Sequence, residues 1–398
     1  MRKNYSVNVR YEKAWRAKEV ALGLLMGSPR ESYSTLHKYG QALKAVNEGT
    51  VFHMKLEDDT FFKYAFMALG CSIRGFGSCI RPILVVDGAH LKGKYKGVLL
   101  TASSIDGNNQ IYPLAFGVVD KECDDSWTWF IERVKICIGD INGLVFIFDQ
   151  HQSITNSVAT VFPDAAHVTC MHHLAIKLNE KFRNEGMQII LAKAAKTFKI
   201  SKFRYYWGQL AGFPRVQKYL KDIGFDKWAR AYQPGMRYNQ MTSNLAESMN
   251  AVLVHARALP ITALFENCRA LLQQWFYERR TAASSRGTVL TEYAEIILKK
   301  EAERVRYHHV RPIDRYQIET LILGYAEPVY PLGDEKDWIL LDDYVPKMIK
   351  PPKFVPRVGR RQTTRIPSAG EVRQVHKCGR CGNVGHNRKT CRQPLRTE

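Results

Sequence analysis

The sequence lacks long apolar runs. None of its 398 residues lies in a stretch approaching the roughly 18 consecutive apolar residues of a membrane helix. The first residues also lack the apolar segment typical of a secretory signal. Acidic residues are scarce, since 38 Asp and Glu stand against 59 Lys and Arg, and the formal net charge is +21. We therefore expect a soluble intracellular protein with no membrane partner.

The sequence also lacks the cysteine pattern of a disulfide-bonded protein. Its nine cysteines are odd in number and scattered through a long chain, which argues against a disulfide framework. Three of them fall within the last 21 residues. That crowding indicates metal binding at the C-terminal end.

What the sequence does contain favours a folded protein with an anionic partner. Hydrophobic residues make up 45% of the chain, which excludes wholesale disorder, and the length allows two or three domains. Residues 346–398 contain 14 Lys and Arg against two acids, a net charge of +12, so residues 1–345 carry the remaining +9. This excess points to nucleic acid as the partner, and the alternative is a basic surface without a specific ligand.

The pattern along the chain predicts a mixed α/β fold. Short β-rich runs and helical patterns alternate as strands at 83–87, 97–105 and 110–120, a helix, a strand at 144–149, a helix, a strand at 166–170 and a helix. Three antiparallel strands followed by alternating helices and strands predict a mixed sheet with helices on its faces. The same order occurs in ribonuclease-H-like domains.

We expect four regions. They are a helical N-terminal region (1–80), which includes a candidate helix at 57–69; a ribonuclease-H-like α/β domain (81–285) with a helical insertion at about 185–240; an irregular region ending in a disordered basic linker (286–375); and a small zinc knuckle (376–393).

The knuckle is the most specific motif in the sequence. Cys378, Cys381, His386 and Cys391 have the spacing C-x2-C-x4-H-x4-C, which suits a closed tetrahedral zinc site. The alternative is a chance Cys/His cluster. The spacing resembles the retroviral-type zinc knuckle, a module associated with single-stranded nucleic acid. Five basic residues around it are candidate phosphate contacts: Lys377, Arg380, Arg388, Lys389 and Arg392.

Two carboxylates follow apolar strand patterns. Asp87 ends ILVVD, and Asp149 ends LVFIFD. If the two strands are neighbours, both carboxylates emerge at one sheet edge, and paired carboxylates are ligands suited to Mg²⁺ or Mn²⁺ in phosphodiester chemistry. The alternatives are an Asp-Gly hairpin turn for Asp87 and a helix N-cap for Asp149.

A third acid and a Cys/His pair remain open to two interpretations each. Glu247 is a candidate third metal ligand, but its spacing from Asn244 is close to a capping box, which the pattern alone favours. Cys170 and His173 lie at a strand–helix junction. Because two ligands cannot close a zinc site, the residues alone favour a buried structural pair.

Taken together, five blocks resemble the transposases of Mutator-like elements (the MULE or MuDR-type family). They are CIRPILVVDGAHLKGKYKGVLLTASSIDGNNQIYPLAFGVVDKECDDSWTWFIERV, FIFDQHQSI, CMHHL, SNLAESMNAVLVHARALPI and CGRCGNVGHNRKTC, which span about 80–395 in order. The resemblance implies a ribonuclease-H-like catalytic domain. It also implies that Asp87, Asp149 and Glu247 form a catalytic, Mg²⁺- or Mn²⁺-binding triad, and it assigns Cys170 and His173 to the family's C-x2-H motif.

The sequence also departs from that family. Residues 298–346 contain no cysteine, so the SWIM zinc finger of many members is absent. We also expect the chain to begin after the N-terminal DNA-binding domain of full-length members. We therefore expect a nuclear Mutator-like transposase, or a truncated or domesticated derivative, that cleaves and transfers DNA with zinc as a structural ion. The alternative is a non-catalytic nucleic-acid-binding regulatory protein. DNA is the expected partner, with single-stranded nucleic acid at the knuckle, and homo-oligomerisation is left open.

Overall fold

The structure is a computed structural model that describes residues 27–149, 151–182, 185–233, 244–305 and 314–353, together with positions 13, 17, 20 and 21. Within these ranges the helices are α3 (Glu31–Val46), α4 (Gly70–Cys79), α5 (Asp124–Ile138), α6 (Gln152–Val161), α7 (Met171–Phe182), α8 (Glu185–Lys196), α9 (Ile200–Gln209), α10 (Pro214–Ile223), α11 (Phe225–Trp228), α12 (Asn244–Val252), α13 (Ile261–Ser284), α14 (Glu292–Val305) and α15 (Ile318–Gly324). None of these described helices combines the length and the apolar character needed to cross a membrane.

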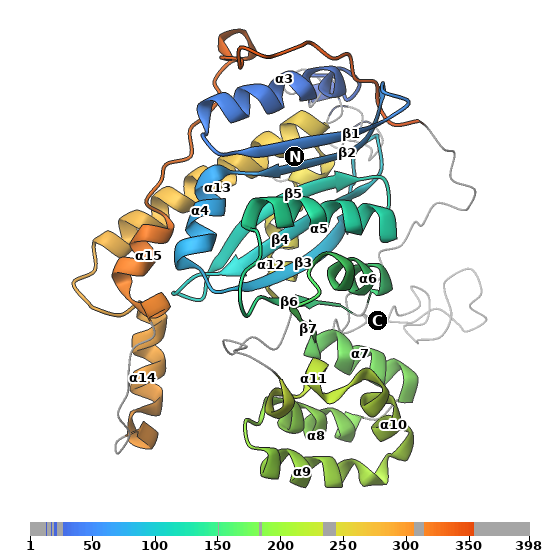
Figure 1. Cartoon of the computed structure of the whole chain (residues 1–398), viewed down its shortest axis with the longest axis vertical. Coiled ribbons are helices and arrows are strands. Elements are labelled where there is room, and N and C mark those ends of the chain that lie inside the picture. The colour runs from blue at the N-terminus through green and yellow to red at the C-terminus, as the bar shows by residue number, and fades with distance from the viewer. Residues whose placement is uncertain are drawn as a thin grey trace, which may run out of the picture. The chain divides into compact units, whose positions relative to one another are not determined.

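The described strands form one mixed sheet (Figure 1). They are β1 (Val51–Glu57), β2 (Phe61–Ala68), β3 (Ile83–His90), β4 (Val98–Ile105), β5 (Ile111–Val119), β6 (Val145–Phe148) and β7 (Ala166–Thr169). Their order across the sheet is β1-β2-β5-β4-β3-β6-β7. β6 runs parallel to β3, β7 runs parallel to β6, and the other pairs are antiparallel. The predicted meander and the mixed α/β architecture are confirmed.

The prediction of a helical N-terminal region was wrong for residues 51–68. These residues form the hairpin β1–β2, and β2 pairs with β5 of the central sheet. The hairpin turns at Asp58 and Asp59, whose φ angles of 50° and 53° lie in the left-handed region. β2 is buried along most of its length, so its sequence does not alternate between apolar and polar residues. Without that alternation, the sequence pattern did not distinguish a strand from a helix at 57–69.

Helices cover both faces of the sheet. On one face, Phe130 of α5 packs so closely on Gly117 of β5 that a Cβ there would lie 2.7 Å from the ring. Gly117 and Gly88 of β3 both pair with Leu100 of β4, so α5 covers the face that carries the even-numbered residues of β3. Ala246 of α12 packs among odd-numbered residues of β3 and β6, on the opposite face. Figure 1 shows α5 and α12 on either side of the sheet.

The segment after α13 belongs to the same compact unit, which extends to Lys353. Helix α15 contributes Ile318 and Leu321 to the main core, and Leu332 and Ile349 join them. The prediction that residues from 286 onward are irregular was therefore wrong for α14 and α15. The apolar residues of this segment are few and widely spaced, and they become a core only against α4 and α13, which the sequence pattern does not show.

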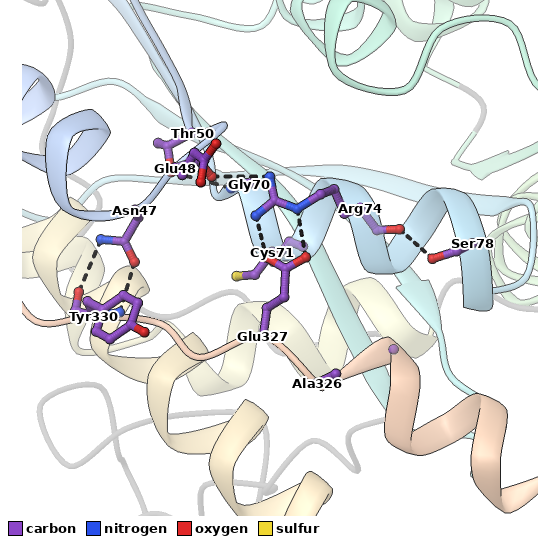
Figure 2. Close-up of polar contacts among 12 residues, drawn as sticks. Asn47, Glu48, Thr50, Gly70, Cys71, Arg74, Ser78, Ala326, Glu327 and Tyr330 are labelled. Atoms are coloured by element: carbon purple, nitrogen blue, oxygen red, sulfur yellow. Dashed lines mark hydrogen bonds and ion pairs between the residues drawn. The ribbon is translucent and has the colours of Figure 1, made fainter.

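Polar contacts attach this segment to the N-terminal half (Figure 2). The Asn47 side-chain amide donates to the Tyr330 carbonyl at 3.1 Å and accepts from the Tyr330 amide at 2.8 Å. Arg74 of α4 forms a two-pronged pair with Glu327, with an Nε–Oε1 distance of 2.7 Å, and also donates to the Glu48 carbonyl at 3.2 Å. A two-pronged guanidinium–carboxylate pair fixes orientation as well as distance.

The described residues of the predicted helical insertion, 185–233, are mostly helical, and they pack with α7. This helical unit (α7 to α11, residues 171–233) has its own core, which contains Leu178, Leu191, Phe203, Leu220 and Trp228. Helix α11 contacts β7, so the unit adjoins the last strand of the sheet.

Candidate metal-binding acid site

Parallel pairing of β3 and β6 brings the two predicted acids together. Val85 pairs with Ile147, and two residues further along the same ladder lie Asp87 and Asp149. Because side chains alternate along a strand, both acids share the face of Val85 and Ile147, which α12 covers. The predicted adjacency of the two strands is confirmed.

Asp87 lies in a half-buried, negatively charged environment. Burial raises the pKa of Asp87 to about 6, and the charges of Asp149 and Glu122 also raise it, while a hydrogen bond from the Gly88 amide and the charge of His173 act in the opposite direction. Mutual repulsion between close carboxylates favours protonation or a bound cation. The site therefore has the electrostatic character of a cation-binding site.

The raised pKa predicts a pH-dependent free energy of unfolding. Between about pH 4 and pH 6 the native state binds more protons at Asp87 than the unfolded state, so stability falls as the pH rises through this range. Asp87→Asn removes the titration, and in metal-free buffer at pH 7 it should stabilise the protein by up to about 3 kcal/mol. Urea unfolding at pH 4, 5, 6 and 7 measures the difference. Asp164→Asn, at an exposed turn, is the control, and equal pH slopes for wild type and Asp87→Asn would contradict the prediction.

Two residues of the α12 region hold Asp87, and neither was predicted from the sequence. The Asn250 side-chain amide donates to Oδ2 of Asp87 at 2.7 Å. Arg257 in turn donates to the Asn250 carbonyl at 3.3 Å, and it also interacts electrostatically with Asp87. Asn250 lies three residues after Glu247, on the same side of the helix. That spacing was the only feature of the sequence that could have indicated Asn250 as a site residue.

Glu122 is a further carboxylate that was not predicted from the sequence. A Cβ at Gly88 would lie 2.8 Å from its carboxylate carbon, so a larger residue there would displace the Glu122 side chain. The hairpin interpretation of Asp87-Gly88 was wrong, because both residues lie inside β3, paired with Thr101 and Leu100. The glycine serves a close contact across the sheet rather than a turn.

Asp149 also accepts a local hydrogen bond. Its Oδ1 accepts from the His151 amide at 3.0 Å, immediately before α6, which begins at Gln152. His151 itself is the N-cap residue and provides no side-chain cap. The N-cap interpretation of Asp149 was therefore wrong, since its hydrogen bond closes a local turn before the helix and caps no helical amide. Its second carboxylate oxygen has no hydrogen bond to a described residue.

Cys170 and His173 meet beside the acids. Cys170 follows β7 and is completely buried, whereas His173 lies in the first turn of α7 and is half-buried. A hydrogen bond between the two side chains raises the pKa of His173, and the charges of Asp149 and Glu247 act in the same direction. A protonated His173 thus partly offsets the negative charge of the site.

Glu247 lies at the rim of this site. Its Oε1 is 3.9 Å from Nε2 of His173, and its side chain is 50% exposed. The side chain of Asn244, the other half of the predicted capping box, lies outside the described residues. Within the described ranges, no three His, Cys, Asp or Glu side chains are grouped closely enough to hold a metal ion. The donor set itself, all carboxylate oxygens, is of the kind that suits Mg²⁺ or Mn²⁺.

The zinc knuckle and its basic neighbours lie outside the described residues, which end at 353. This applies to the four ligands, Cys378, Cys381, His386 and Cys391, and to Lys377, Arg380, Arg388, Lys389 and Arg392.

The region around the acid pair resembles known proteins. Residues 83–177 match the family model of the MULE transposase domain, a range that includes Asp87 and Asp149 and ends before Glu247. Protein FAR1-RELATED SEQUENCE 6 of Arabidopsis thaliana is 20% identical over 222 residues, which cover 52% of this chain and 31% of that relative. The chain thus matches about a third of the relative's length. These similarities support a MULE-type family and a transposase-derived protein.

Proposed function

We propose that the chain is a Mutator-like transposase, or a truncated or domesticated derivative, that acts on DNA by metal-dependent strand cleavage and transfer. The observation that supports this most directly is the parallel register of β3 and β6, which sets Asp87 level with Asp149 on the face covered by α12. The sheet order, three antiparallel strands extended by two parallel ones, is the order we expect of a ribonuclease-H-like domain.

Each residue of the site has a distinct part in the proposed chemistry. Asp87 and Asp149 provide hard oxygen ligands, and Asn250 holds the Asp87 carboxylate in one orientation. Glu247, on the same helix as Asn250, is the third acid of the proposed triad. A bound Mg²⁺ or Mn²⁺ would supply activation of a water or 3′-hydroxyl and stabilisation of the leaving oxygen.

A nicking assay tests the proposed activity. Purified protein with Mg²⁺ or Mn²⁺ should nick supercoiled DNA that carries the ends of the parent element, and EDTA should abolish the nicking. Nicking that persists in EDTA would contradict a metal-dependent reaction. A preparation that binds this DNA but does not nick it with either ion would contradict catalysis and support the non-catalytic alternative.

The knuckle gives a separate prediction. We propose that Cys378, Cys381, His386 and Cys391 bind one zinc ion and that the basic residues around them contact nucleic-acid phosphates. Cys378→Ser should lose one equivalent of zinc per chain and weaken DNA binding, because a four-ligand structural site depends on every ligand. Metal analysis of the purified protein measures the zinc, and Cys137→Ser, outside the motif, is the control. Unchanged zinc content in Cys378→Ser would contradict the ligand set.

The alternative is a non-catalytic nucleic-acid-binding regulatory protein, and one observation favours it. Glu247 is turned toward His173, and no three acids in the described part of the chain form a metal-binding group. In that case Asp87→Ala should leave DNA binding and its salt dependence unchanged while Cys378→Ser abolishes them. In either case we propose that the protein acts in the nucleus, where its DNA lies. Homo-oligomerisation is a further proposal that sedimentation would test.

A further inference from the structure

The net positive charge of residues 1–345 comes from one segment. Residues 171–233, the helical unit, contain 13 Lys and Arg against four Asp and Glu, a net charge of +9. Residues 1–345 as a whole also carry +9, so the other residues in that range sum to zero. The helical unit, not the sheet, is therefore the basic part of the fold.

Within the unit, most of the charge lies in a segment of the sequence that is free of acids. No Asp or Glu occurs between Glu185 and Asp222, and all eight Lys and Arg in that interval are exposed: Lys193, Lys196, Lys199, Lys202, Arg204, Arg215, Lys218 and Lys221. None of the eight forms an ion pair with a described residue. Such charges repel one another and attract a polyanion.

Two aromatic rings lie exposed among these charges. Phe198, in the loop between α8 and α9, is 69% exposed, and Tyr205 of α9 is 64% exposed. The Arg230 guanidinium lies 3.5 Å from the centre of the Phe198 ring. Arg230 therefore contacts one side of the Phe198 ring, and most of the surface of the ring stays open to solvent.

The helix that carries Tyr205 is firmly held. Phe203 is buried in the core of the unit and contacts the rings of Trp207 and Trp228. Lys202 and Tyr205 are three residues apart on the exposed side of the same helix, where they are neighbours. An aromatic ring and a cation are thus presented together from a rigid support.

We propose that the helical unit binds an unpaired nucleic-acid strand, with bases stacked on Phe198 and Tyr205 and phosphates held by the exposed lysines and arginines around them. Stacking on protein aromatics needs a free base face, which a duplex does not offer, whereas cations alone would bind a duplex as well. The inference rests on the nucleic-acid-binding part of the proposed function. It adds a site separate from both the acid pair and the knuckle.

Fluorescence anisotropy with a labelled oligothymidine strand and the full chain tests the stacking. Phe198→Ala should raise Kd about tenfold, since each stacked base adds substantially to affinity. Tyr277→Ala on α13 is the matched control, because this tyrosine is 63% exposed but lies outside the unit, and it should leave Kd unchanged. Competition by blunt duplex should be unaffected by Phe198→Ala.

The phosphate contacts have their own test. The double variant Lys196→Glu and Lys199→Glu should reduce the slope of log K against log salt by about 1.4, since each lost contact to a single strand removes about 0.7. The same exchange at Lys299 and Lys300 of α14 is the matched control. Photocrosslinking of a 5-iodouracil strand should label a peptide within residues 197–206, and it should still do so in Cys378→Ser.

The outcomes separate this site from the catalytic proposal. A Kd for Phe198→Ala within twofold of wild type, an equal loss for Tyr277→Ala, or crosslinks confined to the tail would overturn the inference, whether or not the protein nicks DNA. If the protein binds the single strand through Phe198 but does not nick DNA, the proposed strand-binding site is supported and only the proposed catalysis is contradicted.

Discussion

Asp87→Asn should reduce metal-dependent nicking at least about a thousandfold, because it removes one negative ligand of the proposed triad and with it several kcal/mol of transition-state stabilisation. Asn has nearly the same shape, and its carbonyl oxygen can still accept the hydrogen bond from Asn250. The loss should therefore arise from charge and not from misfolding. Initial nicking rates on supercoiled DNA over a range of Mg²⁺ and Mn²⁺ concentrations measure it.

The matched control is Asp164→Asn, which makes the same chemical change at an exposed turn before β7 and should retain the wild-type rate. A circular dichroism spectrum equal to that of the wild type would confirm that Asp87→Asn is folded. If Asp87→Asn nicks DNA at a rate within tenfold of wild type, Asp87 is not a metal ligand in the reaction and the proposed triad is wrong.

Asp106→Ala should destabilise the protein by about 3–5 kcal/mol, since it removes one partner from a buried charged network. Asp106 is completely buried, and its Oδ1 accepts from the amides of Asn108 at 2.9 Å and Gln110 at 2.7 Å. Its Oδ2 accepts from the Tyr325 hydroxyl at 2.8 Å, to which Arg279 also donates at 2.8 Å. The network joins the β4–β5 turn to α13 and to the residue after α15.

Urea unfolding at pH 7 measures the loss. Asp342→Ala, at an exposed position, should change the free energy of unfolding by less than about 0.5 kcal/mol. If Asp106→Ala does not fold, Tyr325→Phe removes one hydroxyl and its two hydrogen bonds from the same network and should cost about 1–3 kcal/mol. A loss below about 1 kcal/mol for Asp106→Ala would contradict the view that this network stabilises the fold.

Local sequence patterns predicted the central strands well. They failed where pairing with distant segments decides whether a segment is a strand or a helix. β3, β4 and β5 were predicted within a few residues, because Gly- and Asn-rich turns separate their apolar runs. The pattern of residues 57–69 predicts a helix where β2 lies, because a strand buried along most of its length has no alternation of apolar and polar residues. Such a strand is recognisable only by its pairing, here with β1 and β5. The same limit applies to α15, whose apolar side depends on α4 and α13.

The residues of the site also divide into those that a local sequence pattern predicted and those that only the tertiary structure revealed. Asp87 and Asp149 were predicted because each follows an apolar strand pattern, which is a local signal. Asn250 and Glu122 were not, since each is defined by the distant residue that it approaches. Asn250 contacts Asp87 across 163 positions of sequence, and Glu122 lies against Gly88 only because β3 and the end of β5 flank the same strand, β4.

The sequence by itself determined the mixed α/β class, the candidate acids, the knuckle spacing and the excess of positive charge. Only the tertiary structure decided that Asp87 and Asp149 share one row and one face, that Asn250 holds Asp87, and that the charge of the folded part lies on helices outside the sheet. The reason is physical. Composition and spacing are properties of the chain, whereas register, burial and pKa depend on which distant segments the sheet brings together.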